Sequence, residues 1–232
     1  MCYIGDMIWN LSDLIADPIA SLTSLCIMLP IILISLTVHE WGHARAAYAC
    51  GDDTAYLMGR MTLNPFHHID WVGFLCMLFF GFGWAKPVPV NSRKFKNYRK
   101  GEAIVSLAGV MMNLVLVLIG FVALVLIGWL KLEWLLGSEY LFTILYYLIA
   151  LNCTLALFNL LPIYPLDGYH IFELLFAKLL PVNVLLFLRK HGRMVLILFL
   201  LVINVTDLNL FGWLPELLLE GAFGLMQKLA LL

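Results

Sequence analysis

The sequence has few charged residues for its length. Only 12% of its 232 residues are Asp, Glu, Lys or Arg, against 63% apolar residues, and 14 basic side chains nearly balance 15 acidic ones. Nucleic-acid binding needs a basic face, and disorder needs a low apolar content, so both classes are excluded. A mean hydropathy of +0.96 instead indicates an integral membrane protein embedded in a lipid bilayer.

The sequence also lacks a cysteine framework. Its five cysteines are odd in number, show no CxxC spacing and lie mostly in apolar runs. A disulfide scaffold or a thiolate metal site is therefore not expected, and the cysteines are interpreted as small core residues.

Long apolar runs predict about four membrane-spanning helices, with room for up to six. A spanning helix needs about 20 apolar residues. Three runs have this length, residues 19–38, 103–130 and 140–161. A fourth run, residues 194–205, is shorter, because its N-terminal extension would include Arg189, Lys190 and Arg193. We therefore expect an all-α, multi-pass membrane protein.

Two further apolar stretches, residues 71–84 and 168–180, are too short to cross a bilayer. The first contains Gly81 and Gly83 and is expected to form a short re-entrant segment. The sequence shows no internal repeat, and its polar loops are too short for a separate soluble domain. Residues 1–232 are therefore interpreted as one integral-membrane domain.

The distribution of basic residues predicts the orientation in the cell membrane. Eight of the fourteen Lys and Arg residues lie between Arg45 and Lys100, and such loops stay cytoplasmic. The N-terminus is then outside. No Lys or Arg precedes Arg45, so the positive region of a cleavable signal peptide is missing and we expect no processing there.

The first predicted span continues helically into an HExxH motif, His39-Glu40-Trp41-Gly42-His43. Residues four apart share a helix face, so both imidazoles can bind one Zn²⁺ while Glu40 reaches a metal-bound water as general base. A chance match is the alternative. It is disfavoured because His and Glu inside an apolar helix are costly unless they have a function.

Two histidines leave a zinc site incomplete, and the predicted topology nominates Asp167 as the third ligand. The span at residues 140–161 ends on the cytoplasmic side, so Asp167 lies at the same depth as His39 and His43. By itself, Asp167-Gly168 fits an ordinary turn or a helix cap. The agreement in depth favours the ligand interpretation, with one Zn²⁺ per chain.

The order of these motifs, HEWGH followed by LPIYPLDG, resembles the site-2 proteases, zinc metalloproteases that cleave peptide bonds inside membranes. The resemblance covers most of the chain and includes residues 59–70 and 81–91, which look like compact bacterial and archaeal members. It implies that His39, His43 and Asp167 bind zinc and that Glu40 is catalytic.

Several other residues are candidates for a role in the site. Many members of that family have Pro after Gly109, where this chain has Val110, but the Asn three residues on is retained as Asn113. Asn113 is a candidate accessory residue, and interhelical hydrogen bonding is its alternative role. The resemblance favours His68 over its neighbour as a second accessory residue. Gly81 and Gly83 are candidates for substrate binding, with a simple chain turn as the alternative.

The predicted function is hydrolysis of peptide bonds in or near transmembrane segments of substrate proteins, by a zinc-activated water with Glu40 as general base and acid. The active site is expected toward the cytoplasmic side. A metal ion transporter or channel using the same His and Asp residues is the alternative, but it would not need Glu40. A structural zinc site is a third possibility, although such sites usually have four protein ligands.

Overall fold

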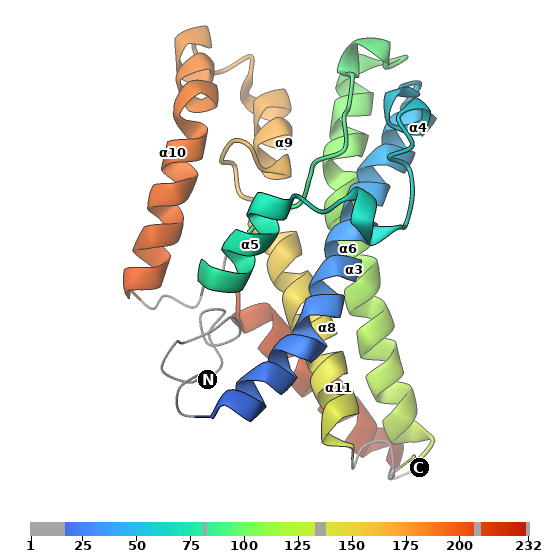
Figure 1. Cartoon of the computed structure of the whole chain (residues 1–232). Coiled ribbons are helices and arrows are strands. Elements are labelled where there is room, and N and C mark those ends of the chain that lie inside the picture. The colour runs from blue at the N-terminus through green and yellow to red at the C-terminus, as the bar shows by residue number, and fades with distance from the viewer. Residues whose placement is uncertain (1–16, 81–82, 133–137, 207–209, 231–232) are drawn as a thin grey trace.

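The computed structural model describes residues 17–80, 83–132, 138–206 and 210–230 (Figure 1). Within these ranges the chain forms eight α-helices and two short 3-10 helices, and it contains no strand beyond one isolated bridge between Ile69 and Ala85. The predicted all-α, multi-pass fold is confirmed.

Three helices among the described residues are long and apolar enough to span a membrane. They are α3 (Pro18–Cys50), α6 (Tyr98–Trp129) and α8 (Glu139–Asn159), and they match the three longest predicted runs. The predicted fourth run lies inside α10 (Val182–Thr206), which also contains Arg189, Lys190 and Arg193. These three charges separate α10 from the candidate spans.

Helix α6 is the centre of the bundle, because it packs along both α3 and α8 and also contacts α9 and α11. Small residues allow the closest approach. A Cβ atom at Gly42 of α3 would lie 3.0 Å from the carbonyl oxygen of Ala108 of α6. A hydrophobic core lies between α6, α8 and α11 (Trp213–Ala230). Its fully buried members include Leu124, Ile149, Cys153 and Ala222.

The limits of α3 follow from its terminal residues. Asp17 accepts a hydrogen bond from the Ala20 N–H at 3.0 Å and caps a helix that starts with Pro18. The helix ends at Gly51, whose φ of 110° is a left-handed conformation that favours glycine. His39 and His43 thus lie in the C-terminal half of a continuous helix.

The segment between α3 and α6 consists of short elements. It contains α4 (Thr54–Leu57), η1 (Pro65–His67), α5 (Trp71–Phe80) and η2 (Ser92–Lys94). The ten residues of α5 are too few to cross a bilayer. Met77 of α5 nevertheless packs against a buried cluster formed by α3 and α8, which supports the predicted re-entrant segment.

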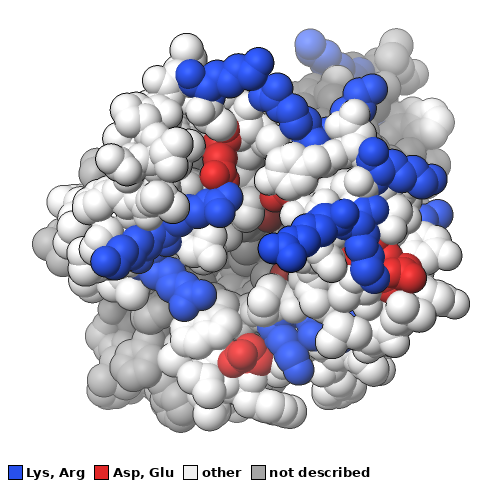
Figure 2. All heavy atoms as spheres, turned by 90° about the horizontal axis from the view of Figure 1, so that it is seen from above, with Lys and Arg blue, Asp and Glu red and all other residues white. Residues whose placement is uncertain are grey.

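Many basic side chains gather on the face shown in Figure 2, which is the end of the bundle at the top of Figure 1. Twelve of the fourteen Lys and Arg residues lie between positions 45 and 100 or between 178 and 193. These stretches include the end of α3, the start of α6 and the start of α10, which Figure 1 shows at the same end. The predicted orientation would place this end in the cytoplasm, and it remains a prediction.

Candidate metal centre

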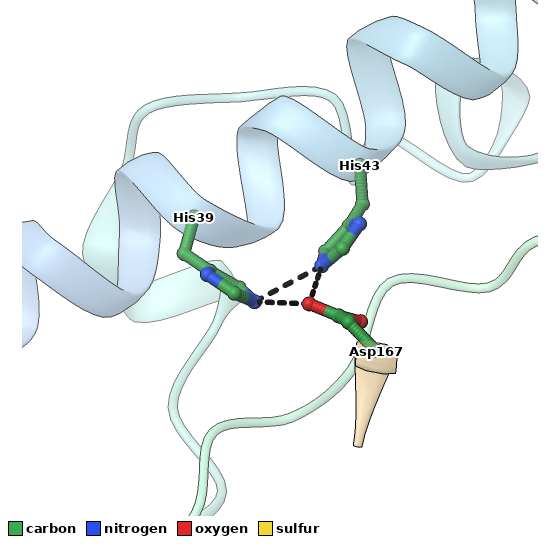
Figure 3. A group of neighbouring side chains, drawn as sticks. All are labelled: His39, His43 and Asp167. Carbon is green, nitrogen blue, oxygen red and sulfur yellow. Dashed lines mark hydrogen bonds and ion pairs between the residues drawn. The ribbon is translucent and has the colours of Figure 1, made fainter. Parts of the chain in front are cut away.

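Three potential metal ligands meet where α3 passes the start of α9 (Asp167–Phe176), as Figure 3 shows. The Nε2 atoms of His39 and His43 are 3.0 Å apart. Oδ2 of Asp167 lies 3.4 Å from the first and 3.3 Å from the second. This is the only such group of three or more metal-ligating side chains among the residues that the structure describes.

The hydrogen bonds of the two imidazoles direct their lone pairs toward one another. His43 donates from Nδ1 to the Val105 carbonyl at 2.8 Å, and His39 donates from Nδ1 to Oδ1 of Asn113 at 3.2 Å. In a neutral imidazole the other nitrogen, Nε2, is then an acceptor. Oδ2 of Asp167 is buried and has no hydrogen-bond donor among the described residues. Three acceptors therefore converge, and a cation between them would satisfy all three.

The donor set and its spacing fit zinc. Two imidazole nitrogens and one carboxylate oxygen are the ligands of many catalytic zinc sites, with a fourth position open. Bonds of 2.0–2.2 Å in a tetrahedron separate ligand atoms by about 3.3–3.5 Å. The measured separations of 3.0, 3.4 and 3.3 Å lie close to these values.

Helix α6 forms the wall behind this cluster. A Cβ atom at Gly109 would lie 2.4 Å from Nε2 of His43 and 2.6 Å from Nε2 of His39, so only glycine leaves room for both rings. Val105 and Asn113 lie one turn to either side of Gly109 and bind the outer nitrogens of the same rings. One face of α6 therefore both orients and accommodates the two imidazoles.

Asp167 is held as a carboxylate. Burial by itself would raise its pKa, but the neighbouring imidazoles of His39 and His43 outweigh this effect and lower the pKa below its usual range. Its position follows from the chain, because Asp167 is the first residue of α9, directly after a loop with Pro162 and Pro165. The ionised form is the one that binds a metal.

Glu40 follows His39 on α3 and lies near His43. Its Oε2 atom accepts a hydrogen bond from the backbone N–H of Val88 at 2.8 Å. Sequence reasoning did not identify Val88, Val105 or the packing role of Gly109. Two of these groups act through backbone atoms, which leave no side-chain signature.

The remaining histidines lie outside the cluster. His68 is buried, and its Nε2 donates to the Thr62 carbonyl at 2.9 Å, whereas His67 is exposed. His170 is turned toward Glu102, with 3.1 Å between Nδ1 and Oε1. His191 stacks on Phe187 within α10.

The candidate substrate-binding glycines are only partly described. Gly81 lies outside the described residues. A Cβ atom at Gly83 would lie 2.2 Å from the carbonyl oxygen of Gly73, so Gly83 packs directly on α5. Binding of substrate at these glycines remains a prediction.

Comparison with known proteins places these observations in a family. The chain is 49% identical over 146 residues to a protein of Bacillus subtilis named "Putative zinc metalloprotease YwhC", which covers 61% of this chain and 65% of that protein. It is 31% identical over 174 residues to "Putative zinc metalloprotease Rip2" of Mycolicibacterium smegmatis, covering 73% of this chain and 64% of that protein.

The matches thus span somewhat less than two thirds of the length of these two relatives. No solved structure matches the chain. The family model described as "Peptidase family M50" matches residues 27–203, a range that contains all three potential metal ligands and Glu40. This chain therefore belongs to peptidase family M50, the family of the site-2 proteases.

Proposed function

We propose that this chain is a zinc metalloprotease that cleaves peptide bonds in or near transmembrane segments of other proteins. The observation that carries the proposal is the convergence of two imidazole lone pairs and one buried carboxylate oxygen, each about 3 Å from the others, beside Glu40. Membership of the M50 family and the names of the relatives support it.

His39, His43 and Asp167 would hold one Zn²⁺ per chain. The hydrogen bonds to Asn113 and Val105 keep both imidazoles in the tautomer that binds metal through Nε2. A bound zinc ion would supply a lowered pKa for a coordinated water and polarisation of the scissile carbonyl. Side chains of the cluster are 82% or more buried, which excludes most bulk water.

Glu40 is the proposed general base and acid. It takes a proton from the attacking water and then passes that proton to the leaving amine. Asn113 is the proposed accessory residue, because it orients His39 while its own Nδ2 is buried without a hydrogen-bond partner in the described structure. That amide can donate to a substrate carbonyl. His68 acts at a distance, by bracing the loop that precedes α5.

The substrate is proposed to approach within the bilayer. His39 and His43 lie in the second half of α3, toward the end of the bundle where most Lys and Arg residues gather, so the positive-inside rule predicts a site at the cytoplasmic side, with the N-terminus outside. A transmembrane segment of another protein reaches this depth without leaving the lipid. The extended chain around Gly83 is the proposed place where part of that segment binds.

The alternative function is metal transport. A transporter needs ligands along a path through the membrane, whereas the described residues place their metal ligands in one cluster. The two functions differ in the role of Glu40, which transport does not require.

The decisive experiment uses purified protein in detergent with a panel of single-span model substrates. Cleavage that stops on addition of a zinc chelator, returns with added zinc and is absent in Glu40→Gln supports the proposal. Metal uptake into vesicles by Glu40→Gln, without cleavage by the wild type, would support a transporter instead.

A further inference from the structure

The extended segment from Ala85 to Asn91 crosses the HExxH part of α3. Its sequence explains why it is extended, because Pro87 and Pro89 cannot continue a helix and restrict the residues before them. Proline also lacks an N–H. Since alternate residues of an extended chain point the same way, one edge of this segment lacks donors at Pro87 and Pro89, and the other keeps the N–H groups of Lys86, Val88 and Val90.

The N-terminal part of this segment is fixed by the loop that precedes α5. The Lys86 N–H donates to the His68 carbonyl at 2.9 Å. The guanidinium of Arg60 donates to the carbonyl oxygens of Lys86 at 2.8 Å and Pro87 at 3.2 Å. These bonds hold the carbonyl of the peptide that carries the Val88 N–H and the carbonyl of the peptide before it.

The C-terminal part of the segment is fixed by Asp52. This side chain is fully buried, and its Oδ2 accepts from the Asn91 N–H at 2.6 Å. Its Oδ1 accepts from both the N–H and the hydroxyl of Thr54. Burial alone would raise the pKa of Asp52, but these hydrogen bonds outweigh it and lower the pKa, so Asp52 is a carboxylate with all its donors in place.

Between these two anchors, Val88 faces α3. Its side chain packs against Ala44, one turn after Glu40, and against Ala55. Its N–H makes the one hydrogen bond that Glu40 receives within the described part of the chain. One carboxylate oxygen of Glu40 is thereby held, and the other is left for a water or a substrate.

We propose that the backbone N–H of Val88 positions the carboxylate of Glu40 for proton transfer, and that Arg60 and Asp52 are positioning residues that act through this peptide. The inference rests on the proposed role of Glu40 as general base. A glutamate side chain has three rotatable bonds, and a general base works only within hydrogen-bond reach of the proton that it takes. A fixed peptide donor removes most of that freedom before the substrate binds.

The test compares two substitutions at the same position. Val88→Pro removes the N–H and keeps an apolar ring between two existing prolines, whereas Val88→Ala keeps the N–H and removes packing against Ala44. We expect Val88→Pro to lower kcat about tenfold or more with KM within about twofold and zinc content unchanged. Val88→Ala should keep kcat within about threefold of wild type. Equal kcat values for the two variants would overturn the proposal.

A second measurement does not depend on activity or on the folding of Val88→Pro. In zinc-loaded protein labelled with ¹⁵N-valine, the Val88 amide proton should resonate downfield because it bonds a carboxylate. Glu40→Ala, checked for unchanged zinc content, should move this signal upfield by about 1 ppm or more. An unmoved signal would show that the bond is not formed and would end the proposal.

A third experiment tests the positioning role of Asp52. Asp52→Asn places an amide N–H₂ where the Asn91 N–H or the Thr54 N–H now donates, so it should lower kcat in the same direction as Val88→Pro and shift the Val88 amide signal. A lowered kcat with an unshifted signal would give Asp52 a merely structural role. Failure of the proposed function can be told apart from failure of the inference about Val88. Cleavage by Glu40→Gln would refute the proposed function. An inactive Glu40→Gln beside a fully active Val88→Pro would refute only this inference.

Discussion

The substitution Gly109→Ala tests the metal centre at its tightest point. The new methyl group would lie 2.4 Å from Nε2 of His43, 2.5 Å from Cε1 of His39 and 2.6 Å from Nε2 of His39. Ordinary contacts of a Cβ atom begin near 3.4 Å. One or both rings must therefore move by about 1 Å, away from the wall that α6 provides.

The expected loss of zinc affinity follows from the narrow range of ligand distances that a zinc site accepts. Ligand distances are held within about 0.2 Å of 2.0–2.1 Å, so a displacement of 1 Å breaks the site unless α3 and α6 separate. The shift also strains the hydrogen bonds of the rings to Val105 and Asn113, and loss of such supporting bonds weakens metal binding about 10–100-fold. We expect zinc affinity to fall about 100-fold, which is about 2.7 kcal/mol.

The fold itself should tolerate this change, because alanine is favoured over glycine inside a helix by about 1 kcal/mol. A matched control lies on the same helix. Gly120→Ala makes the same exchange, and its Cβ atom would meet Cγ1 of the buried Ile149 at 2.9 Å, in a core cluster that contains none of the metal ligands. Zinc affinity measured by competition with a chelator, together with the melting temperature, separates the two variants.

Gly109→Ala should lose zinc at a nearly unchanged melting temperature of the metal-free protein, and Gly120→Ala should keep zinc. Wild-type zinc affinity in Gly109→Ala would refute the close packing of both imidazoles on α6. Equal loss in both variants would show that the effect arises from helix packing in general.

Other predictions follow from the same geometry. Glu40→Gln should keep zinc and fold but lose about 10²–10⁴-fold in kcat, measured on a model substrate, because an amide cannot accept the water's proton. Asp167→Ala should lower zinc content as well as activity, and full zinc occupancy by elemental analysis would mean that another residue is the third ligand. Gly83→Val should lower cleavage of helical membrane substrates while zinc stays bound, and parallel loss of zinc would give this glycine only its packing role against α5. Cysteine accessibility labelling should find residues 45–100 cytoplasmic and the N-terminus outside, and the opposite pattern would contradict the proposed depth of the site.

The parts of the site that could be predicted from sequence are those with local geometry. His39 and His43 are four residues apart on one apolar helix, and the helix alone brings their side chains together. Asp167 is far away in sequence, but it follows α8, which among the described candidate spans is the other one predicted to end on the same side as α3. Both predictions depend on the number and direction of the helices and not on how their side chains pack.

The bounds and the partner of α10 were not predictable in the same way. A short apolar run follows Arg189, Lys190 and Arg193, and in the structure all of it belongs to one helix of 25 residues. Arg189 pairs with Glu173 of α9 at 2.7 Å, and this pair fastens the helix that starts with Asp167. The sequence predicts that these three basic residues lie at a membrane interface. It cannot predict that Arg189 pairs with Glu173, because tertiary packing brings the two together.

The contribution of α6 shows why the rest of the site was hidden. Val110 stands where many members of the family that the sequence resembles have proline, and α6 continues through this position without a break, with Val110 buried. What matters for the metal centre is a stripe with a spacing of four residues, Val105, Gly109 and Asn113. The first offers a carbonyl, the second offers space and the third offers an amide oxygen.

These three residues of α6 serve the metal site only because α3 packs against them. Asn113 meets His39 and Val105 meets His43, so the two helices run in opposite directions and the imidazoles straddle Gly109. A shift of either helix by one turn would place a side chain of α6 against the ligand nitrogens. The register between α3 and α6 is therefore as much a part of the metal site as the HExxH motif, and it depends on the close approach at Gly42 that the motif itself contains.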